Sequence, residues 1–167
     1  MRDISDLMSL KGKRALITGA VGGLGQEIAL TIAELGGDLL LVDLPNTDYT
    51  TVTQKVLDSC NVQVECVDCD LENEVERNSL ISKVNTDSKG LNILINNAAF
   101  VGTSGLEGWV TDFESQSVDT WRRAIEVNLT AVFHLSQGLA PLLKKSAGGS
   151  IINIASIYAI NGPDYSL

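Results

Sequence analysis

A glycine-rich segment offers the clearest chemistry in this sequence. It follows a short apolar run, Arg14 to Thr18, and consists of Gly19, Ala20, Val21, Gly22, Gly23, Leu24 and Gly25. Glycines at positions 19, 23 and 25 permit a tight turn, a close backbone approach to a pyrophosphate and close packing of a helix on a strand. A helix that starts here adds unpaired N–H groups and partial positive charge. We therefore expect a dinucleotide phosphate site, with a plain glycine-rich surface turn as the alternative.

Asp43 is a second candidate for nucleotide binding. It ends the apolar run Leu39 to Val42, about twenty residues after the glycines, which is the spacing of a carboxylate that accepts hydrogen bonds from an adenosine ribose. A carboxylate there repels a 2′-phosphate, and no Arg or Lys occurs between Thr18 and Leu44 to offset it. The sequence therefore predicts NAD in preference to NADP, with an incidental aspartate at a strand end as the alternative.

These residues require a scaffold of alternating strands and helices, which the sequence also predicts. Short apolar runs indicate strands over 14–18, 38–42, 62–67, 91–95 and 150–155. Runs of helical spacing indicate helices over 24–35, 50–59, 72–86 and 118–143. Residues 100–117, with one short helical turn, and 156–167 are expected to be loops. Such alternation gives a parallel sheet covered on both faces, so the expected fold class is α/β, a doubly wound, Rossmann-like sheet.

The composition excludes several classes of protein. Of the 167 residues, 44% are hydrophobic and 20% are charged, as in an ordinary globular domain and unlike a disordered chain. The net charge of −9 argues against a nucleic-acid partner, because nucleic-acid domains concentrate Lys and Arg on one face. We expect residues 1–167 to form a single NAD-binding domain.

Targeting and metal-binding signals are weak. The first ten residues contain Arg2, Asp3 and Asp6 and no apolar core of a signal peptide, and no run approaches the roughly 20 apolar residues of a membrane span. We expect reduced thiols in a cytoplasmic protein without a membrane partner. Cys66 and Cys69 form a lone CxxC with no second ligand pair, so we expect thiols on and beside a buried strand, and no metal.

Two further motifs complete a recognisable pattern. Asp70-Leu71 follows the third predicted strand, and Asn96-Asn97-Ala98-Ala99 follows the fourth. Together with Thr18 and the glycines at 19, 23 and 25, they make the chain resemble the short-chain dehydrogenase/reductase family over almost its whole length. The resemblance implies that Asp70 and Leu71 lie by the adenine ring, and that Asn97, Ala98 and Ala99 lie near the nicotinamide ribose. Ala99 replaces the family's last glycine, and we expect it to tighten the backbone there.

The resemblance also implies an oxidoreductase that transfers a hydride between NAD and an alcohol or carbonyl substrate of small size. Asn128, in the long helix, matches the residue that holds a water of the proton relay, and Ser156 matches the residue that hydrogen-bonds the substrate oxygen. From the residues alone, a helix-surface Asn and a strand-ending Ser are the alternatives. An amide among the apolar neighbours of Asn128 needs hydrogen-bond partners in any case.

The family's proton-transferring pair is absent from these residues. The family uses a Tyr with a Lys four residues later, because a nearby positive charge favours the phenolate. Here Tyr158 is followed by Gly162 at that spacing, and Tyr165 is followed only by Ser166 and Leu167. The chain alone is therefore expected to be inactive.

Two explanations of the missing pair remain open. In the first, the chain is the N-terminal portion of an NAD-dependent enzyme, truncated after the fifth strand and a homo-dimer or tetramer when intact. In the second, it is a natural short form that acts as a non-catalytic NAD-binding sensor or scaffold. We expect the first, because the sequence stops within a loop and leaves the fifth strand as an exposed edge of the sheet.

Overall fold

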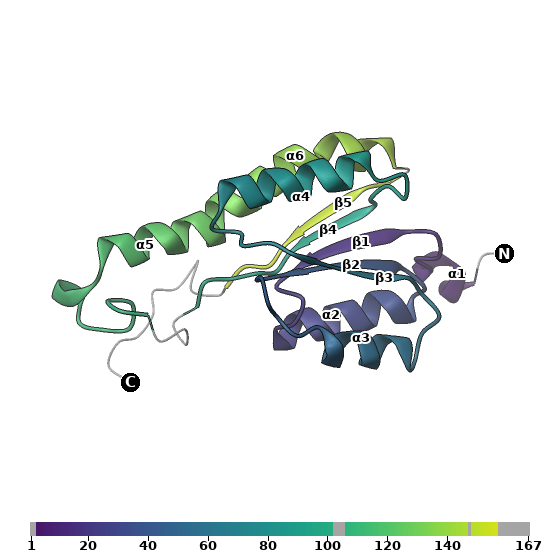
Figure 1. Cartoon of the computed structure of the whole chain (residues 1–167). Coiled ribbons are helices and arrows are strands. Elements are labelled where there is room, and N and C mark those ends of the chain that lie inside the picture. Colours follow the sequence, from purple (N-terminus) through teal and green to yellow (C-terminus); the bar gives the residue numbers. More distant parts are fainter. Residues whose placement is uncertain (1–2, 102–105, 147, 157–167) are drawn as a thin grey trace.

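A five-stranded parallel sheet forms the centre of the computed structural model, which describes residues 3–101, 106–146 and 148–156 (Figure 1). The strands are β1 (Arg14–Thr18), β2 (Asp38–Asp43), β3 (Val64–Asp68), β4 (Ile93–Asn96) and β5 (Ser150–Asn153). Their order is β3-β2-β1-β4-β5, and every neighbouring pair is parallel. The predicted doubly wound α/β fold is confirmed. Of the loop expected over 156–167, residues 157–167, with Tyr158 and Tyr165, lie outside the described residues.

Helices cover both faces of this sheet (Figure 1). One layer holds α2 (Gly23–Glu34) and α3 (Thr50–Leu57), and the other holds α4 (Glu74–Thr86) and α6 (Ala131–Lys145). The short helix α1 (Ile4–Met8) precedes β1, and α5 (Val118–Ile125) extends beyond the sheet. None of the helices in the described ranges is long and apolar enough to cross a membrane.

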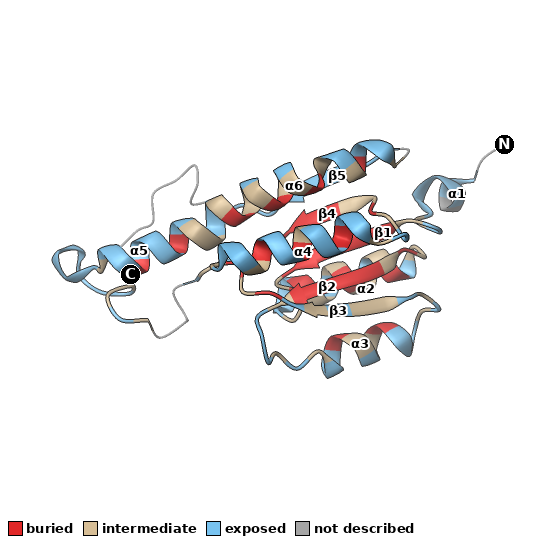
Figure 2. Ribbon diagram, turned by 45° about the horizontal axis from the view of Figure 1, so that its top comes forward, coloured by how far each residue is buried: buried red, intermediate tan, exposed pale blue. Residues whose placement is uncertain are grey.

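Two apolar cores lie between the sheet and its helix layers, and Figure 2 shows the central strands as the most buried elements. Successive strand residues face opposite sides, so Leu16 packs into the core that contains Leu135 of α6, whereas Ile17 packs into the core that contains Ala29 of α2. Because both faces of β2 are covered, its apolar run from Leu39 to Val42 is buried throughout.

The two edge strands are more exposed than the central ones. β3 has no strand beyond it in the described sheet, and Cys66 on it is exposed. The expectation that this thiol lies on a buried strand is therefore wrong, although Cys69, just after β3, is buried. Within the described residues no group of three His, Cys, Asp or Glu side chains could hold a metal ion. At the other edge all four residues of β5 are exposed, as predicted for the fifth strand.

The helix predicted over 118–143 is divided into three parts. α5 begins after its cap Ser117, whose side chain accepts a hydrogen bond from the N–H of Thr120. A π-helical turn, η3 (Glu126–Thr130), separates α5 from α6. Apolar spacing did not reveal this turn. One extra residue in a turn rotates the following residues about the helix axis, but the helix remains equally apolar in composition. Such turns are frequent at functional sites, and this one contains Asn128. The short turn expected before the long helix is the 3₁₀ helix η2 (Phe113–Ser115).

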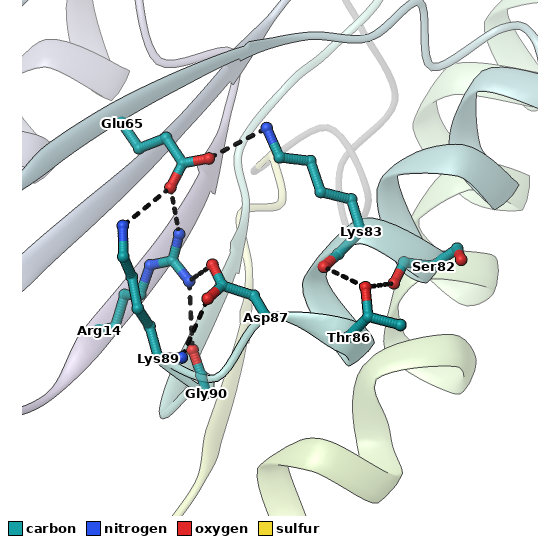
Figure 3. Close-up of polar contacts among 8 residues, drawn as sticks. All are labelled: Arg14, Glu65, Ser82, Lys83, Thr86, Asp87, Lys89 and Gly90. Atoms are coloured by element: carbon teal, nitrogen blue, oxygen red, sulfur yellow. Dashed lines mark hydrogen bonds and ion pairs between the residues drawn. The ribbon is translucent and has the colours of Figure 1, made fainter.

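A cluster of charged side chains joins β1, β3 and α4 near the amino ends of the strands (Figure 3). Arg14 is only 5% exposed and lies 2.8 Å from Glu65 and 2.7 Å from Asp87. Lys83 and Lys89 contact the same Glu65 carboxylate at 3.0 and 3.4 Å. The hydrogen bond from Lys83 is the main reason that the pKa of Glu65 lies below its usual value. This ionic cluster lies at the opposite end of the strands from the predicted nucleotide residues.

Candidate dinucleotide-binding site

A cavity of about 610 Å³ opens at the carboxyl ends of the strands. It lies where β1 has β2 on one side and β4 on the other, and ligands of open parallel sheets bind in the crevice at such a switch point. Most of the predicted nucleotide residues line it, namely Gly19, Gly22, Gly23, Leu24, Gly25, Asp43, Asp70, Leu71, Asn97, Ala98 and Ala99. Ala20 and Val21 do not, since Ala20 is buried in an apolar core and Val21 packs against the same core.

Two glycines allow the turn after β1 to pack closely against its neighbours. Gly19 has a φ of +63°, and a Cβ there would lie 2.8 Å from the Cα of Ala98. A Cβ at Gly25 would collide with the carbonyl oxygen of Gly19. Any side chain at either position would therefore displace the turn from the end of β4 or from the start of α2.

The start of α2 is open toward the cavity. Its N-cap, Gly22, has no side chain that could accept hydrogen bonds from the first N–H groups of the helix. A Cβ at Gly23 would meet no atom within 4 Å, and Gly23 and Leu24 both line the cavity. The uncapped N–H groups and the partial positive charge of the helix end suit a pyrophosphate, so these residues fit a dinucleotide.

The glycine-rich turn itself holds the Asp43 side chain in place. The Oδ2 atom of Asp43 accepts a hydrogen bond from the Val21 N–H at 2.8 Å, and Oδ1 accepts one from the Leu44 N–H at 2.9 Å. Each carboxylate oxygen has a second lone pair, which can accept a hydroxyl hydrogen from a ribose. The half-buried carboxylate lines the cavity at the end of β2, where the sequence placed the ribose contact.

The segment after β3 forms an acidic and apolar wall of the cavity. Asp70 accepts a hydrogen bond from the Glu72 N–H at 2.9 Å, and the Asp70 N–H donates to Glu76 at 2.6 Å. Leu71 is buried. Desolvation, followed by the charges of Glu76 and Asp70, raises the pKa of the Cys69 thiol to about 12, so this thiol stays protonated and apolar. A flat aromatic ring could pack on this wall, with Asp70 at its polar edge.

Thr18 joins the two strands that border the cavity, a role that its place in the motif did not reveal. Its hydroxyl oxygen accepts hydrogen bonds from the N–H groups of Asn97 and Ala98, both at 3.1 Å. The Asn97 side chain donates in return to the carbonyl oxygens of Thr18 and Gly19, both at 3.0 Å. The motif does mark Thr18, which directly precedes the glycines. It does not indicate the partners of Thr18, because Asn97 and Ala98 lie far away in the sequence.

Arg123 of α5 also lines the cavity, and nothing in the local sequence marks it. Its Nε donates to Glu72 at 2.7 Å, and its guanidinium lies 5.3 Å from the centre of the Phe100 ring. The ring of Phe100 meets that of Trp109 edge-on at 5.3 Å. Hydrogen bonding to Glu72 raises the pKa of Arg123. Among the described residues that line the cavity, Arg123 is the one Lys or Arg.

A comparison with protein families agrees with this geometry. The family model described as short chain dehydrogenase matches residues 13–166. The chain belongs to the short-chain dehydrogenase family. Its glycine-rich turn, its Asp70-Leu71 pair and its Asn96-Asn97-Ala98 segment all lie within the matched residues.

Individual proteins match most of this chain, but the match covers only part of their own length. The 7alpha-hydroxysteroid dehydrogenase of Escherichia coli K12 is 35% identical over 157 residues, which cover 94% of this chain and 58% of that protein. The crystal structure of L-sorbose reductase from Gluconobacter frateurii, complexed with NADPH and L-sorbose, has a TM-score of 0.79 and 27% identity, covering 92% of this chain and 56% of that one. NAD+-bound xylitol dehydrogenase has a TM-score of 0.79 and 26% identity, with the same coverage of 92% and 56%.

Ala99 fits this short-chain dehydrogenase backbone without glycine. Among the described residues other than glycine, only Asn46 has a positive φ, at 66°. Ala99 therefore occupies a backbone conformation that any residue adopts, and nothing in its conformation requires the glycine that is usual in the family.

Asn128 connects the π-helical turn to the segment that follows the Asn97 motif. Its Oδ1 accepts a hydrogen bond from the Phe100 N–H at 2.7 Å, and its Nδ2 donates to the Phe100 carbonyl oxygen at 3.2 Å. The expectation that this amide has hydrogen-bond partners is confirmed. Asn128 itself does not line the cavity, but the adjacent Val127 does.

Ser156 lies just after β5 and is exposed. Ile154, two residues earlier, lines the cavity, whereas Ser156 does not. Asn128 and Ser156, which the sequence resemblance predicts to be catalytic, thus each lie within two residues of the cavity lining.

Proposed function

We propose that this chain is the dinucleotide-binding part of an NAD-dependent oxidoreductase, which transfers a hydride between nicotinamide and an alcohol or carbonyl group of a small molecule. The observation that carries the proposal is the cavity at the switch point, bordered by a glycine turn, an uncapped helix start and a carboxylate on the next strand. Two of the structures named above contain NAD+ or NADPH, which supports it.

In this proposal the chain's residues bind the cofactor along the cavity. The N–H groups at the start of α2 face the pyrophosphate, and Asp43 accepts a hydroxyl hydrogen of the adenosine ribose. Leu71 packs on the adenine ring with Asp70 at its edge, and the nicotinamide ribose lies by Asn97, Ala98 and Ala99. The bound nicotinamide ring supplies the site that accepts or releases the hydride.

The catalytic part of the proposal concerns two residues of this chain. Ser156 would hydrogen-bond the substrate oxygen, because it follows a strand at the carboxyl edge where the cavity opens. Asn128 would support a proton relay from η3, next to the cavity-lining Val127. Neither residue transfers the proton in this scheme. Proton transfer requires a further group, a general acid such as a tyrosine.

We also propose that the cofactor is NAD rather than NADP. Asp43 is the cross-strand partner of Asp68, so two carboxylates lie at the same end of β2 and β3. A 2′-phosphate placed there meets negative charge, whereas a 2′-hydroxyl can donate to Asp43. Arg123 does not offset this charge in the proposal, because it is paired with Glu72.

A second candidate function is a non-catalytic NAD-binding sensor or scaffold. The observation that favours it is that Tyr49 and Tyr158 are followed at the fourth position by Thr53 and Gly162, and not by Lys. For the chain by itself, both candidates lead us to propose nucleotide binding without turnover. A reading frame that continues past Leu167 and encodes the Tyr and Lys would decide for the enzyme, and a stop codon there would decide for the sensor.

We further propose a cytoplasmic protein that assembles as a homo-dimer or tetramer. Three free cysteines support a reducing compartment. Trp121 of α5, Leu129 of η3 and Phe133 of α6 expose apolar side chains, which supports assembly through this helix.

Calorimetric titration of the purified chain with NAD+, NADP+ and ADP-ribose tests the proposed function. We expect saturable binding of NAD+ and ADP-ribose, and binding of NADP+ that is weaker by about tenfold or more. Failure of all three nucleotides to bind would overturn the nucleotide site. Equal affinities for NAD+ and NADP+ would overturn only the cofactor preference, and a substrate-dependent change in NADH absorbance would overturn the absence of turnover.

A further inference from the structure

Arg77 of α4 is the largest fully buried charged side chain among the described residues, with 1% of its surface exposed. Its guanidinium donates to three acceptors from three different segments. One is the carbonyl oxygen of Leu71, the second is Glu126 Oε1 at 2.5 Å, and the third is the Nδ1 atom of His134 at 3.2 Å. All three nitrogens of the guanidinium are therefore engaged.

A buried cation of this kind is not needed to hold α4 and α6 together. Apolar contacts already do so, since Leu80 of α4 and Leu135 of α6 are buried in the same core. Removing a charge from water is costly, and apolar replacements of buried ion pairs are often at least as stable. What Arg77 adds is geometry, because a planar guanidinium fixes the directions of its hydrogen bonds as no apolar side chain can.

The segments that Arg77 joins are two walls of the cavity. Leu71 lines the cavity after β3. Glu126 is the first residue of η3, and the next residue, Val127, also lines the cavity. Asn128, one residue further, makes both hydrogen bonds to the Phe100 backbone. A single buried side chain thus connects the proposed adenine wall with the turn that carries the proposed relay residue.

We propose that Arg77 is a positioning residue for the dinucleotide site. It sets the separation between the Leu71 wall and η3, and through Glu126 it places Asn128 against Phe100. This inference rests on the proposed function as far as nucleotide affinity is concerned. The placement of Asn128 against Phe100 does not depend on any nucleotide, so it is tested separately.

Arg14 is the matched control. It is also a buried arginine, 5% exposed, and it contacts two carboxylates, Glu65 and Asp87, in the ionic cluster of Figure 3. It lies at the amino ends of the strands and does not line the cavity. A merely structural role would make substitutions of Arg77 and Arg14 equivalent for the nucleotide site.

The experiment compares Arg77→Lys with Arg14→Lys in the full 167-residue chain. Lysine keeps the charge but presents one ammonium group in place of the planar fork. Calorimetry measures the Kd of ADP-ribose, and NMR-detected hydrogen exchange measures the Phe100 amide, which donates to Asn128. The amides of Ile17 and Leu40, which lie in the central strands, report any global loss of stability.

For Arg77→Lys we expect the Kd to rise about tenfold and the Phe100 amide to exchange about tenfold faster, relative to Ile17 and Leu40. For Arg14→Lys we expect both values to stay within about twofold of the original chain. Unchanged values for Arg77→Lys, or equal changes in the two variants, would overturn the inference. If the original chain binds no ADP-ribose, the proposed function is lost, and Phe100 exchange alone decides the positioning role.

Glu126→Asp provides a second variant should Arg77→Lys fail to fold. Glu126 is only partly buried, and aspartate keeps its charge while shortening the reach to Arg77 by one methylene group. We expect faster exchange of the Phe100 amide, because η3 must then shift to keep the ion pair. Wild-type exchange at Phe100 in this variant would count against the inference.

Discussion

The carboxylate of Asp43 accepts a hydrogen bond of 2.8 Å from the backbone N–H of Val21. The end of β2 is therefore joined directly to the glycine-rich turn between β1 and α2. The same side chain that is proposed to contact the ribose also orients the turn proposed to contact the pyrophosphate. Changes at Asp43 should act on both parts of the nucleotide, and this determines how the residue is best tested.

Asp43→Asn is expected to weaken NAD+ binding by about tenfold or more, because hydrogen bonds to a charged group contribute roughly 1.5–3 kcal/mol. The amide oxygen can still accept from Val21, so the turn should keep its place. Loss of the negative charge should also reduce the difference between the affinities for NAD+ and NADP+. Calorimetry with both nucleotides measures these effects. Glu34→Gln, which changes an exposed carboxylate on α2 that does not line the cavity, is the control, and unchanged affinities in Asp43→Asn would contradict the assigned role.

Gly23→Ala and Gly25→Ala are expected to separate binding from stability. A methyl group at Gly23 enters the open cavity, so we expect the Kd of ADP-ribose to rise about tenfold or more. The free energy of unfolding of Gly23→Ala should be unchanged or up to about 1 kcal/mol higher, since Ala is the better helix former.

A methyl group at Gly25 meets the Gly19 carbonyl oxygen. We therefore expect Gly25→Ala to lower the free energy of unfolding by about 1–3 kcal/mol and to lose nucleotide binding. Urea unfolding and calorimetry check both variants; wild-type affinity in Gly23→Ala would refute the phosphate position.

Arg123→Met is expected to weaken ADP-ribose binding about three- to tenfold at low salt, because it leaves its partner Glu72 as an unpaired negative charge in the cavity lining. The Kd should also depend less on ionic strength than in the original chain. Arg122→Met removes the same charge from the adjacent, more exposed residue, which is paired with Asp119 and does not line the cavity. Titrations at two salt concentrations compare the variants, and equal effects of the two would show that only net charge matters.

Glu65 is expected to make the stability of the protein depend on acidic pH. Hydrogen bonding to Lys83 is the main cause that lowers its pKa in the folded state below the ordinary value of 4.5. On acidification the unfolded chain therefore takes up this proton first. The stabilisation is complete above the unfolded pKa and is lost as pH falls through the lower, folded pKa.

The measurement for Glu65 is urea unfolding between about pH 6 and pH 3. We expect Glu65→Gln to lose less stability over this range than the original chain, by less than about 1 kcal/mol, since solvent screens the partly exposed carboxylate. Glu34→Gln, an exposed position on α2 outside the ion pairs of the described residues, should follow the original chain. If the stability of Glu65→Gln and that of the original chain depend on pH in the same way, the ionic cluster has no role in acid stability.

Local patterns were enough to predict most of the elements, but they failed at two places for physical reasons. The helix over 118–143 has continuous apolar spacing, so local periodicity does not show the π-helical turn at 126–130, in which Asn128 accepts a hydrogen bond from the distant Phe100 N–H. Cys66 lies in an apolar run, yet it is exposed because β3 lies at an edge of the described sheet. Strand order and edge positions depend on how distant segments pair.

By itself, the sequence determined the order of strands and helices, the glycine-rich turn and the position of Asp43 at the end of a strand. These features depend on local periodicity and on the backbone freedom of glycine, which neighbouring residues encode. Only the tertiary structure decided that Arg123 lines the cavity and that the buried Arg77 connects two of its walls. Their partners Glu126 and Glu72 lie 49 and 51 residues away, and such contacts arise only when the sheet brings α4, α5 and the segment after β3 together.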